Sequence, residues 1–181
     1  MAEKQEEARY SLTDVLTTEK GELRVGDVRC IIMTESAFTF LQQVIAEQAP
    51  ELVKYGFYDM GYRAGRDLAR TARRVADTPE EAFRFLVEIY QQSGYGEMEV
   101  VAFDLSKPEA RLRGHNLMES TAAAKSGIYR TPRAVDHYSR GMVAGLFSEL
   151  LGMEVVCEEM ACEYRGDDAC EFVVLPFGGG E

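Results

Sequence analysis

The chain has 181 residues, a length that suits one domain with a substantial hydrophobic core. Its 46% hydrophobic and 28% charged residues are typical of a globular protein and exclude a disordered one. The formal net charge of −11 argues against a nucleic-acid partner, because a strongly acidic protein repels the phosphate backbone.

The N-terminal part of the chain is predicted to contain a polar arm and a short β region. Residues 1–20 are polar and predict an arm with one ordered piece around Leu12–Leu16. Residues 21–33 alternate between polar and apolar side chains and are rich in β-branched residues. This pattern predicts one or two strands with a turn near Gly26.

Three helices are predicted to follow these strands. Apolar residues recur at helical spacing over residues 36–48. The next helix, residues 50–76, opens with a proline, which is favoured at the first helical position. The third helix spans residues 78–94, where Thr78 and Glu81 are typical of a capping box.

The second half of the chain is predicted to alternate hairpins and helices. The expected elements are two strands, two helices and two further strands: residues 97–105, 110–118, 120–126, 132–151, 154–164 and 169–176. Clustered hairpins favour an antiparallel sheet with helices packed on it, an α+β fold. We therefore expect one domain over residues 21–176, between the arm of residues 1–20 and a flexible tail, residues 177–181.

Three of the four cysteines lie close together near the C-terminus. Cys157, Cys162 and Cys170 follow the spacing C-x4-C-x7-C, with carboxylates between them. Cys162 and Cys170 are symmetric about the turn, so a regular antiparallel hairpin would make them face each other. Strand alternation places Cys157 and Glu159 on the other face, unless a bulge near Met160–Ala161 shifts the register.

The residues alone leave three interpretations of this cysteine cluster. Free cysteines are commonly buried as small apolar residues, whereas clustered thiolates beside carboxylates suit zinc. The third interpretation is a disulfide. It is disfavoured because the N-terminal sequence lacks the apolar stretch of a secretory signal, which predicts a cytoplasmic location where thiols stay reduced. No apolar run approaches the length of a membrane span either.

Residues 141–174, GMVAGLFSELLGMEVVCEEMACEYRGDDACEFVV, resemble the vinyl-4-reductase-type domain. In that pattern a G-x-x-x-G helix leads into a strand, a cysteine and then x-G-D-x-x-C-x-F. The same domain forms the sensory part of phenol- and xylene-responsive transcription activators. It also occurs in small stand-alone archaeal and bacterial proteins. A looser similarity in element order extends over residues 25–176.

The resemblance implies a fold, an assembly and a metal site. The fold would be the α+β fold of subunits of a vesicle-tethering complex, assembled as a homodimer around an internal pocket for a small apolar or aromatic molecule. In the aromatic-sensing relatives a zinc ion lies beside this pocket. Its ligands there are a Glu and a Cys of one strand, a Cys of the next strand and a Cys at the start of the preceding helix.

Carried over by position, the first three zinc ligands become Glu159, Cys162 and Cys170. The fourth falls on Asp136, next to His137, and the absence of a cysteine there is a departure from the relatives. Asp136 and His137 can both coordinate zinc, and Cys157 is a further candidate for the fourth position.

The predicted pocket lies between the helices and the sheet. Glycine pairs at Gly61 and Gly65, and at Gly141 and Gly145, indicate either close helix packing or room for a ligand. Tyrosine rings and apolar side chains on these helices suit an aromatic or hydrocarbon ligand. The candidate ligand-binding residues are Phe57, Tyr58, Gly61, Tyr62, Tyr138 and Met142. The strand of residues 100–103 is expected to contribute to the lining.

The sequence offers little material for catalysis. It has two histidines, no phosphate loop and no dinucleotide fingerprint after a strand. Together with the resemblance, this predicts a stand-alone protein that binds or senses a hydrocarbon or aromatic molecule, forms a homodimer, holds a structural zinc ion and signals through a protein partner. One alternative is an accessory protein or enzyme in tetrapyrrole vinyl reduction. Another is a scaffold subunit.

Overall fold

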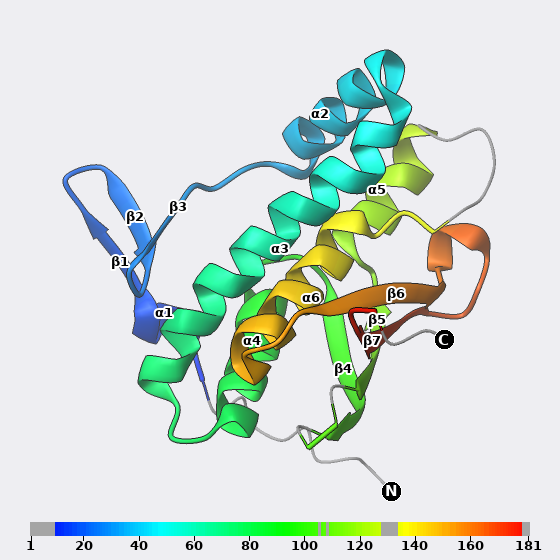
Figure 1. Ribbon diagram of the computed structural model, residues 1–181. Helices are drawn as coiled ribbons and strands as arrows, with labels where there is room; N and C mark the ends of the chain where they lie inside the picture. Colours follow the sequence, from blue (N-terminus) through cyan, green and yellow to red (C-terminus); the bar gives the residue numbers. More distant parts are fainter. Residues whose placement is uncertain (1–9, 105, 108, 128–133, 179–181) are drawn as a thin grey trace, which may run out of the picture.

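The computed structural model describes residues 10–104, 106–107, 109–127 and 134–178 (Figure 1). Its elements in chain order are α1 (Leu12–Val15), β1 (Leu16–Glu19), β2 (Glu22–Val25), β3 (Val28–Cys30), α2 (Glu35–Gln48), α3 (Pro50–Val75), α4 (Pro79–Gln92), β4 (Glu97–Asp104), β5 (Glu109–His115), α5 (Met118–Ser126), α6 (His137–Leu151), β6 (Val155–Ala161), the 3-10 turn η1 (Glu163–Arg165) and β7 (Cys170–Pro176). Two antiparallel sheets result, in the orders β1-β2-β3 and β4-β5-β7-β6. The predicted α+β fold, an antiparallel sheet with helices packed on it, is confirmed.

The hydrophobic core lies between the four-stranded sheet and the helices α3, α4 and α6 (Figure 1). Alternation along the central strands turns one face inward. Leu112 of β5 pairs with Phe172 of β7, and both are buried. The flanking pair Arg113 and Glu171 points outward, where the two side chains form an ion pair of 3.1 Å. One face of the sheet is therefore apolar and the other carries charge, as expected for a sheet covered on one side.

Helices α3 and α6 run side by side in direct backbone contact (Figure 1). A Cβ atom added at Gly61 would lie 2.1 Å from the carbonyl oxygen of Tyr138, and one at Gly145 would lie 2.0 Å from that of Tyr62. Gly65 and Gly141 meet the opposite helix in the same way. The predicted close packing of helices through G-x-x-x-G pairs is thus confirmed.

The small sheet of β1, β2 and β3 lies apart from the main sheet, beside the C-terminal half of α3 (Figure 1). The predicted turn is present at Gly26, whose φ of +57° is a left-handed conformation that glycine adopts without strain. Upstream of this sheet, Tyr10 packs edge-on against Phe85 at 5.3 Å, and its N–H donates to Glu88 of α4. The start of the described arm therefore packs against α4, whereas Leu16–Glu19, predicted as part of the arm, form strand β1 and pair with β2.

Most predicted helix boundaries lie within two residues of the observed ones. Thr78 caps α4, since its hydroxyl accepts the N–H of Glu81 at 3.1 Å. The Glu81 carboxylate accepts the N–H of Asp77, one residue before the position that a regular capping box would use. No helix among the described residues is long and apolar enough to cross a membrane.

The helix predicted for residues 132–151 requires a correction at its start. It begins at His137, and residues 134–136 are not helical; Pro132 lies outside the described residues. The N–H of Asp136 donates to Glu159 of β6 at 3.1 Å, and the Asp136 carboxylate accepts two bonds from Ser120 of α5. These long-range contacts hold Asp136 outside the helix.

Candidate metal cluster and ligand cavity

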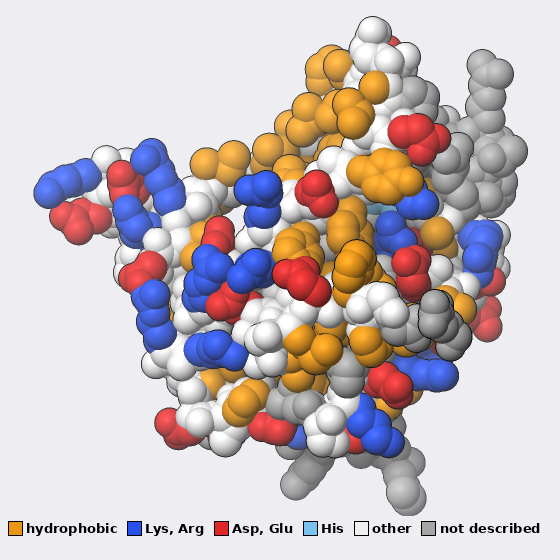
Figure 2. Space-filling model, in the orientation of Figure 1, with side chains coloured by type: hydrophobic (Ala, Val, Ile, Leu, Met, Phe, Trp, Pro, Cys, Tyr) orange, Lys and Arg blue, Asp and Glu red, His pale blue; other side chains and the backbone are white. Residues whose placement is uncertain are grey.

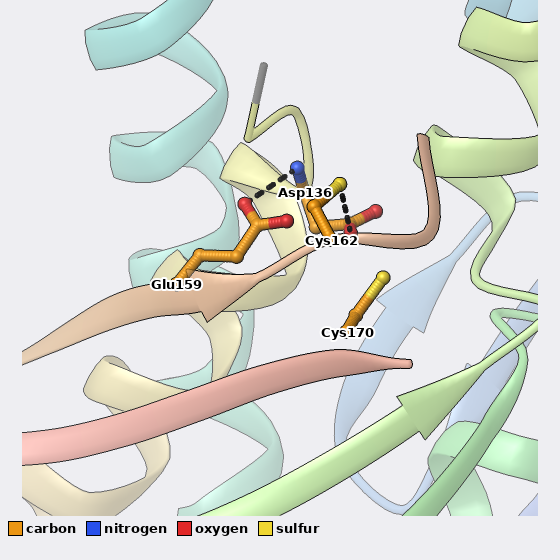
Figure 3. Close-up of side chains that lie close together, drawn as sticks. All are labelled: Asp136, Glu159, Cys162 and Cys170. Carbon is orange, nitrogen blue, oxygen red and sulfur yellow. Dashed lines mark hydrogen bonds between the residues drawn. The ribbon is translucent and has the colours of Figure 1, made fainter. Parts of the chain in front are cut away.

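Four buried side chains, Asp136, Glu159, Cys162 and Cys170, converge at the end of the last hairpin (Figure 3). Each offers one ligand atom, and these atoms all lie within 4.8 Å of one another. Glu159 comes from β6, Cys162 follows β6 directly, and Cys170 opens β7. Asp136 reaches the same point from the residue before α6, so the cluster joins the hairpin to that helix.

A β-bulge brings Glu159 and Cys162 to the same side of the hairpin. Glu159 pairs with Phe172 and Ala161 pairs with Glu171, so two steps on β6 match one step on β7. In a regular strand Glu159 and Cys162 would point to opposite faces, and the extra residue, Met160, removes this difference. The bulge that the sequence required for a joint site is therefore present.

Hydrogen bonds from Ser120 and from the backbone of Glu163 orient Asp136, Cys162 and Cys170. The Ser120 hydroxyl donates to Asp136 Oδ2 at 2.7 Å and lies 3.4 Å from the sulfur atoms of both Cys162 and Cys170. The backbone N–H of Glu163 donates to the Cys170 sulfur at 3.3 Å. Such N–H and O–H donors favour ligand atoms that carry negative charge.

One oxygen of the cluster lacks any partner. Glu159 Oε2 accepts the N–H of Asp136, but Glu159 Oε1 is buried and accepts no hydrogen bond from any described residue. A buried oxygen of this kind costs free energy unless a donor or a cation reaches it. Two thiols and two carboxylates around such an atom match the ligand types of zinc. The residues present therefore fit a bound divalent metal ion.

The electrostatics of the cluster point the same way. Burial raises the pKa of Glu159 to about 11, and burial also raises the pKa of Asp136, to about 6. A hydrogen bond from the Cys170 thiol lowers the pKa of Cys162 to about 5, and the same bond raises the pKa of Cys170. Without a cation, the four groups thus share protons rather than ionise together. A divalent cation would relieve this repulsion and displace the protons.

The second feature is a cavity of about 40 Å³ between α3, α4, α6 and the sheet. Its walls are Gly65, Leu68, Phe83, Leu86, Val87, Ile89, Tyr90, Ser93, Tyr95, Met98, Leu112, Met142, Val143 and Leu146. Most of these side chains are apolar. Three tyrosine rings stack along its edge, with centroids 5.2 Å apart for Tyr90 and Tyr95 and 5.4 Å apart for Tyr95 and Tyr138.

The chain matches two known family models. A family model described as Activator of aromatic catabolism matches residues 12–106, more than half of the chain. The chain belongs to the aromatic-catabolism activator family. A model of the vinyl-4-reductase domain also matches residues 123–176, which include α6 and the hairpin with the cysteine cluster. The resemblance to the vinyl-4-reductase-type domain is therefore confirmed.

The chain is also similar to individual known proteins. The transcriptional regulatory protein XylR of Pseudomonas putida is 24% identical over 162 residues, which cover 85% of this chain. The chain spans only 28% of the length of that regulator. The phenol-responsive sensory domain of the transcription activator PoxR, solved with phenol, superposes with a TM-score of 0.82 at 17% identity and covers 94% of this chain and 89% of that one.

The fold is also similar to that of a subunit of a trafficking complex. Subunit 3 of the trafficking protein particle complex from Naegleria fowleri superposes with a TM-score of 0.55 at 14% identity, covering 78% of this chain and 93% of that one. The implied relation to the fold of tethering-complex subunits is confirmed. At these identities, the structural likenesses establish the fold alone.

Two predicted alternatives for the fourth metal ligand lie outside the cluster. Cys157 is buried on the core face of β6, and its N–H donates to Tyr58 Oη at 3.4 Å. His137 lies in the first turn of α6, where its Nδ1 is 3.5 Å from Arg140. Among the described residues, the group that could hold a metal contains neither of them and contains Asp136 instead.

Most of the residues that the sequence predicted to bind a ligand lie outside the cavity wall. Met142 lines the cavity, and Tyr138 stacks on the lining residue Tyr95. Four others have structural neighbours: Gly61 contacts the α6 backbone, Phe57 packs on Phe38, Tyr58 bonds Cys157 and Tyr62 bonds Glu154. On α3 the cavity begins one turn later, at Gly65 and Leu68.

Sequence reasoning did not assign α4 to the cavity, although α4 supplies much of the wall. Phe83, Leu86, Ile89 and Tyr90 form its apolar stripe, and all four line the cavity. This stripe was visible as helical periodicity, but periodicity alone does not distinguish side chains that fill a core from side chains that border a void. The sheet contributes Met98 and Leu112 rather than residues 100–103.

Proposed function

We propose that this chain is the sensor module of an aromatic-responsive protein and that it binds a small apolar molecule, with monocyclic aromatics as the first class to test. The observation that carries the proposal is the apolar cavity between three helices and the sheet. Membership of the aromatic-catabolism activator family supports it. The likeness to a phenol-responsive sensory domain supports the fold on which it depends.

The size of the cavity suggests how sensing would work. An engineered protein cavity that binds benzene measures about 150 Å³, whereas this one measures about 40 Å³. A six-membered ring would therefore enter only if the walls move. Two wall residues, Met98 and Met142, are flexible and unbranched, so they can change rotamer at low cost. A cavity that must expand to accept its ligand links binding to a change of shape, as a sensor requires.

A cavity-filling substitution tests this function. Val87 of α4 is half-buried and lines the cavity, so Val87→Phe should place a ring in the space that a ligand would use. Overpacking of this kind costs about 1–3 kcal/mol. We therefore expect phenol and toluene, measured by calorimetry, to bind the variant at least about tenfold more weakly than the native protein.

The matched control is Val75→Phe, because Val75 is exposed at the end of α3. This variant should bind both compounds as the native protein does. The proposed function is wrong if neither compound, nor a larger hydrocarbon, binds the native protein. Equal binding by all three proteins would place the ligand elsewhere.

We further propose that Asp136, Glu159, Cys162 and Cys170 hold one zinc ion with a structural role. Zinc would join the last hairpin to the start of α6, which is the helix that forms one wall of the cavity. The unpartnered Glu159 oxygen and the convergence of the four ligand atoms support this assignment. The four cysteines are free thiols, which fits the cytoplasm as the working compartment.

We also propose a homodimer that uses an apolar face formed by residues 31–33 after β3, by α2 and by the N-terminal half of α3. Figure 2 shows hydrophobic side chains gathered along this upper edge of the molecule. Its exposed members include Ile31, Ile32, Met33, Phe40, Leu41, Val44, Leu52 and Tyr55. Contiguous apolar surface of this kind is typical of protein–protein interfaces. The signal would then pass to a protein partner.

A further inference from the structure

Glu119 of α5 is a buried carboxylate with an unusual number of hydrogen-bond donors around it. Only 1% of its surface is exposed. Its two oxygens accept the backbone N–H groups of Tyr138 and Ser139 at 2.9 Å each. The Ser139 hydroxyl donates at 3.1 Å, and Gln42 Nε2 of α2 donates at 3.4 Å. One side chain therefore joins α2, α5 and α6.

This carboxylate lies between the cavity and α2. On the cavity side, the Ser139 hydroxyl is 2.9 Å from the hydroxyl of Tyr90, and Tyr90 lines the cavity. On the other side, Gln42 is 3% exposed and anchors the inner face of α2. The outer face of the same helix carries the exposed side chains of Phe40 and Val44.

Some of the hydrogen bonds to Glu119 serve only to cap the start of α6. The N–H groups of Tyr138 and Ser139 lie in the first turn of α6 and have no partner within the helix, so Glu119 satisfies them as a cap would. Gln42 is not needed for that role. Its amide instead adds a further donor to Glu119, and the exposed pair Lys125–Glu35 also joins α5 to α2.

We propose that Glu119 is a positioning residue that couples the cavity to α2 through the sequence of contacts Tyr90–Ser139–Glu119–Gln42. A molecule that displaces Tyr90 would change the bond at Ser139, and the buried carboxylate would then redistribute its remaining donors. Because an unsatisfied buried acceptor is costly, the Gln42 contact and the packing of α2 would follow. This inference rests on the proposed function only for the identity of the stimulus.

The coupling can be tested without any ligand. Hydrogen exchange of α2 peptides is measured in the native protein, in Tyr90→Phe, in Gln42→Leu and in the double variant. Tyr90→Phe removes the hydroxyl at the cavity end, and we expect about fivefold faster exchange in α2. In the Gln42→Leu background the same change should have no further effect on α2. Peptides from β5 serve as a measure of overall stability and should not respond.

Tyr62→Phe is the matched control, since it removes a hydroxyl that donates to Glu154, away from this set of contacts. It should leave exchange in α2 unchanged. The proposal is overturned if Tyr90→Phe has no effect on α2, if its effect is the same with and without Gln42, or if β5 responds to the same degree.

A second arm uses phenol and toluene as probes. In the native protein, a bound probe should change exchange in α2. In Gln42→Leu the probe should still bind, within about threefold of the native affinity, but α2 should no longer respond. A native α2 that ignores a bound probe would contradict the coupling. If neither probe binds, the proposed function fails, and the ligand-free arm still decides whether the coupling exists.

Discussion

At the scale of single residues, the unpartnered oxygen of Glu159 and the thiols beside it lead to a prediction about metal content. Native protein purified without chelator should contain one equivalent of zinc by elemental analysis. Cys162→Ser should lose the metal and lower the melting temperature by about 5 °C or more, because metal binding contributes directly to folding.

Two further variants decide the fourth ligand. Asp136→Asn should weaken zinc retention, whereas Cys157→Ser should retain zinc, since Cys157 lies outside the cluster. The reverse result would make Cys157 the fourth ligand. Native protein with far less than one equivalent of zinc, and with Cys162 and Cys170 both reactive as free thiols, would show that the cluster is only a packed hairpin.

Glu119 supports a second prediction at this scale. In the native protein, Gln42, Tyr138 and Ser139 donate hydrogen bonds to the two oxygens of Glu119. In Glu119→Gln, the amide nitrogen would replace one of these oxygens and leave its donors without an acceptor. Leaving buried donors without an acceptor costs about 1–3 kcal/mol. Denaturant unfolding should show a loss of this size. Glu35→Gln, an exposed change on α2, should cost less than about 1 kcal/mol. Equal losses would mean that the Glu119 bonds contribute little.

At the scale of helices and strands, the glycines between α3 and α6 allow a matched comparison. Gly145→Ala would place a Cβ 2.0 Å from the carbonyl oxygen of Tyr62, and backbone atoms on both helices leave little room to adjust. We expect a loss of about 3 kcal/mol or more in the free energy of unfolding. Gly56→Ala, on the exposed side of α3 where no atom lies within 4 Å, should instead stabilise by up to about 1 kcal/mol. Equal effects would contradict the close contact.

Most helices and strands could be predicted from the sequence, because caps, turns and apolar periodicity are set by residues close together in the chain. Thr78 and Pro79 mark the start of α4, and the required bulge followed from the parity of Glu159 and Cys162. The start of α6 did not follow, because Asp136 is held by Glu159 and Ser120, which lie far from it along the chain. Such contacts override the local helix signal.

The candidate sites also divide into parts that the sequence predicted and parts that depend on tertiary packing. Hairpin geometry could pair Cys162 with Cys170, and the resemblance added Glu159 and Asp136. The cavity could not be located in this way, because its position depends on where α4 meets α3 and α6. A shift of one helical turn separates the predicted Phe57–Tyr62 from the observed Gly65 and Leu68. Periodicity identifies the inward face of a helix but not the turn at which packing leaves a gap.

At the scale of the whole molecule, the apolar face predicts self-association. Sedimentation at micromolar concentration should give twice the chain mass of 20.3 kDa. Ile32→Asp should shift the protein to monomer, because Ile32 is 88% exposed in the proposed interface and a buried charge there would be unpaired. Phe177→Asp changes a similarly exposed residue beyond β7 and should leave the dimer intact. Sedimentation of the native protein as a monomer would contradict the proposed homodimer.

The backbone contact between α3 and α6 also determines which wall of the cavity can yield. Each glycine receives a carbonyl group of the opposite helix, so sliding or turning either helix would bring atoms into overlap within a fraction of an ångström. These two helices therefore form the rigid wall. An entering ring would have to push against α4, which meets its neighbours through side chains that can change rotamer. The four glycine contacts therefore predict that a cavity accepting a ligand would expand toward α4 and away from α3 and α6.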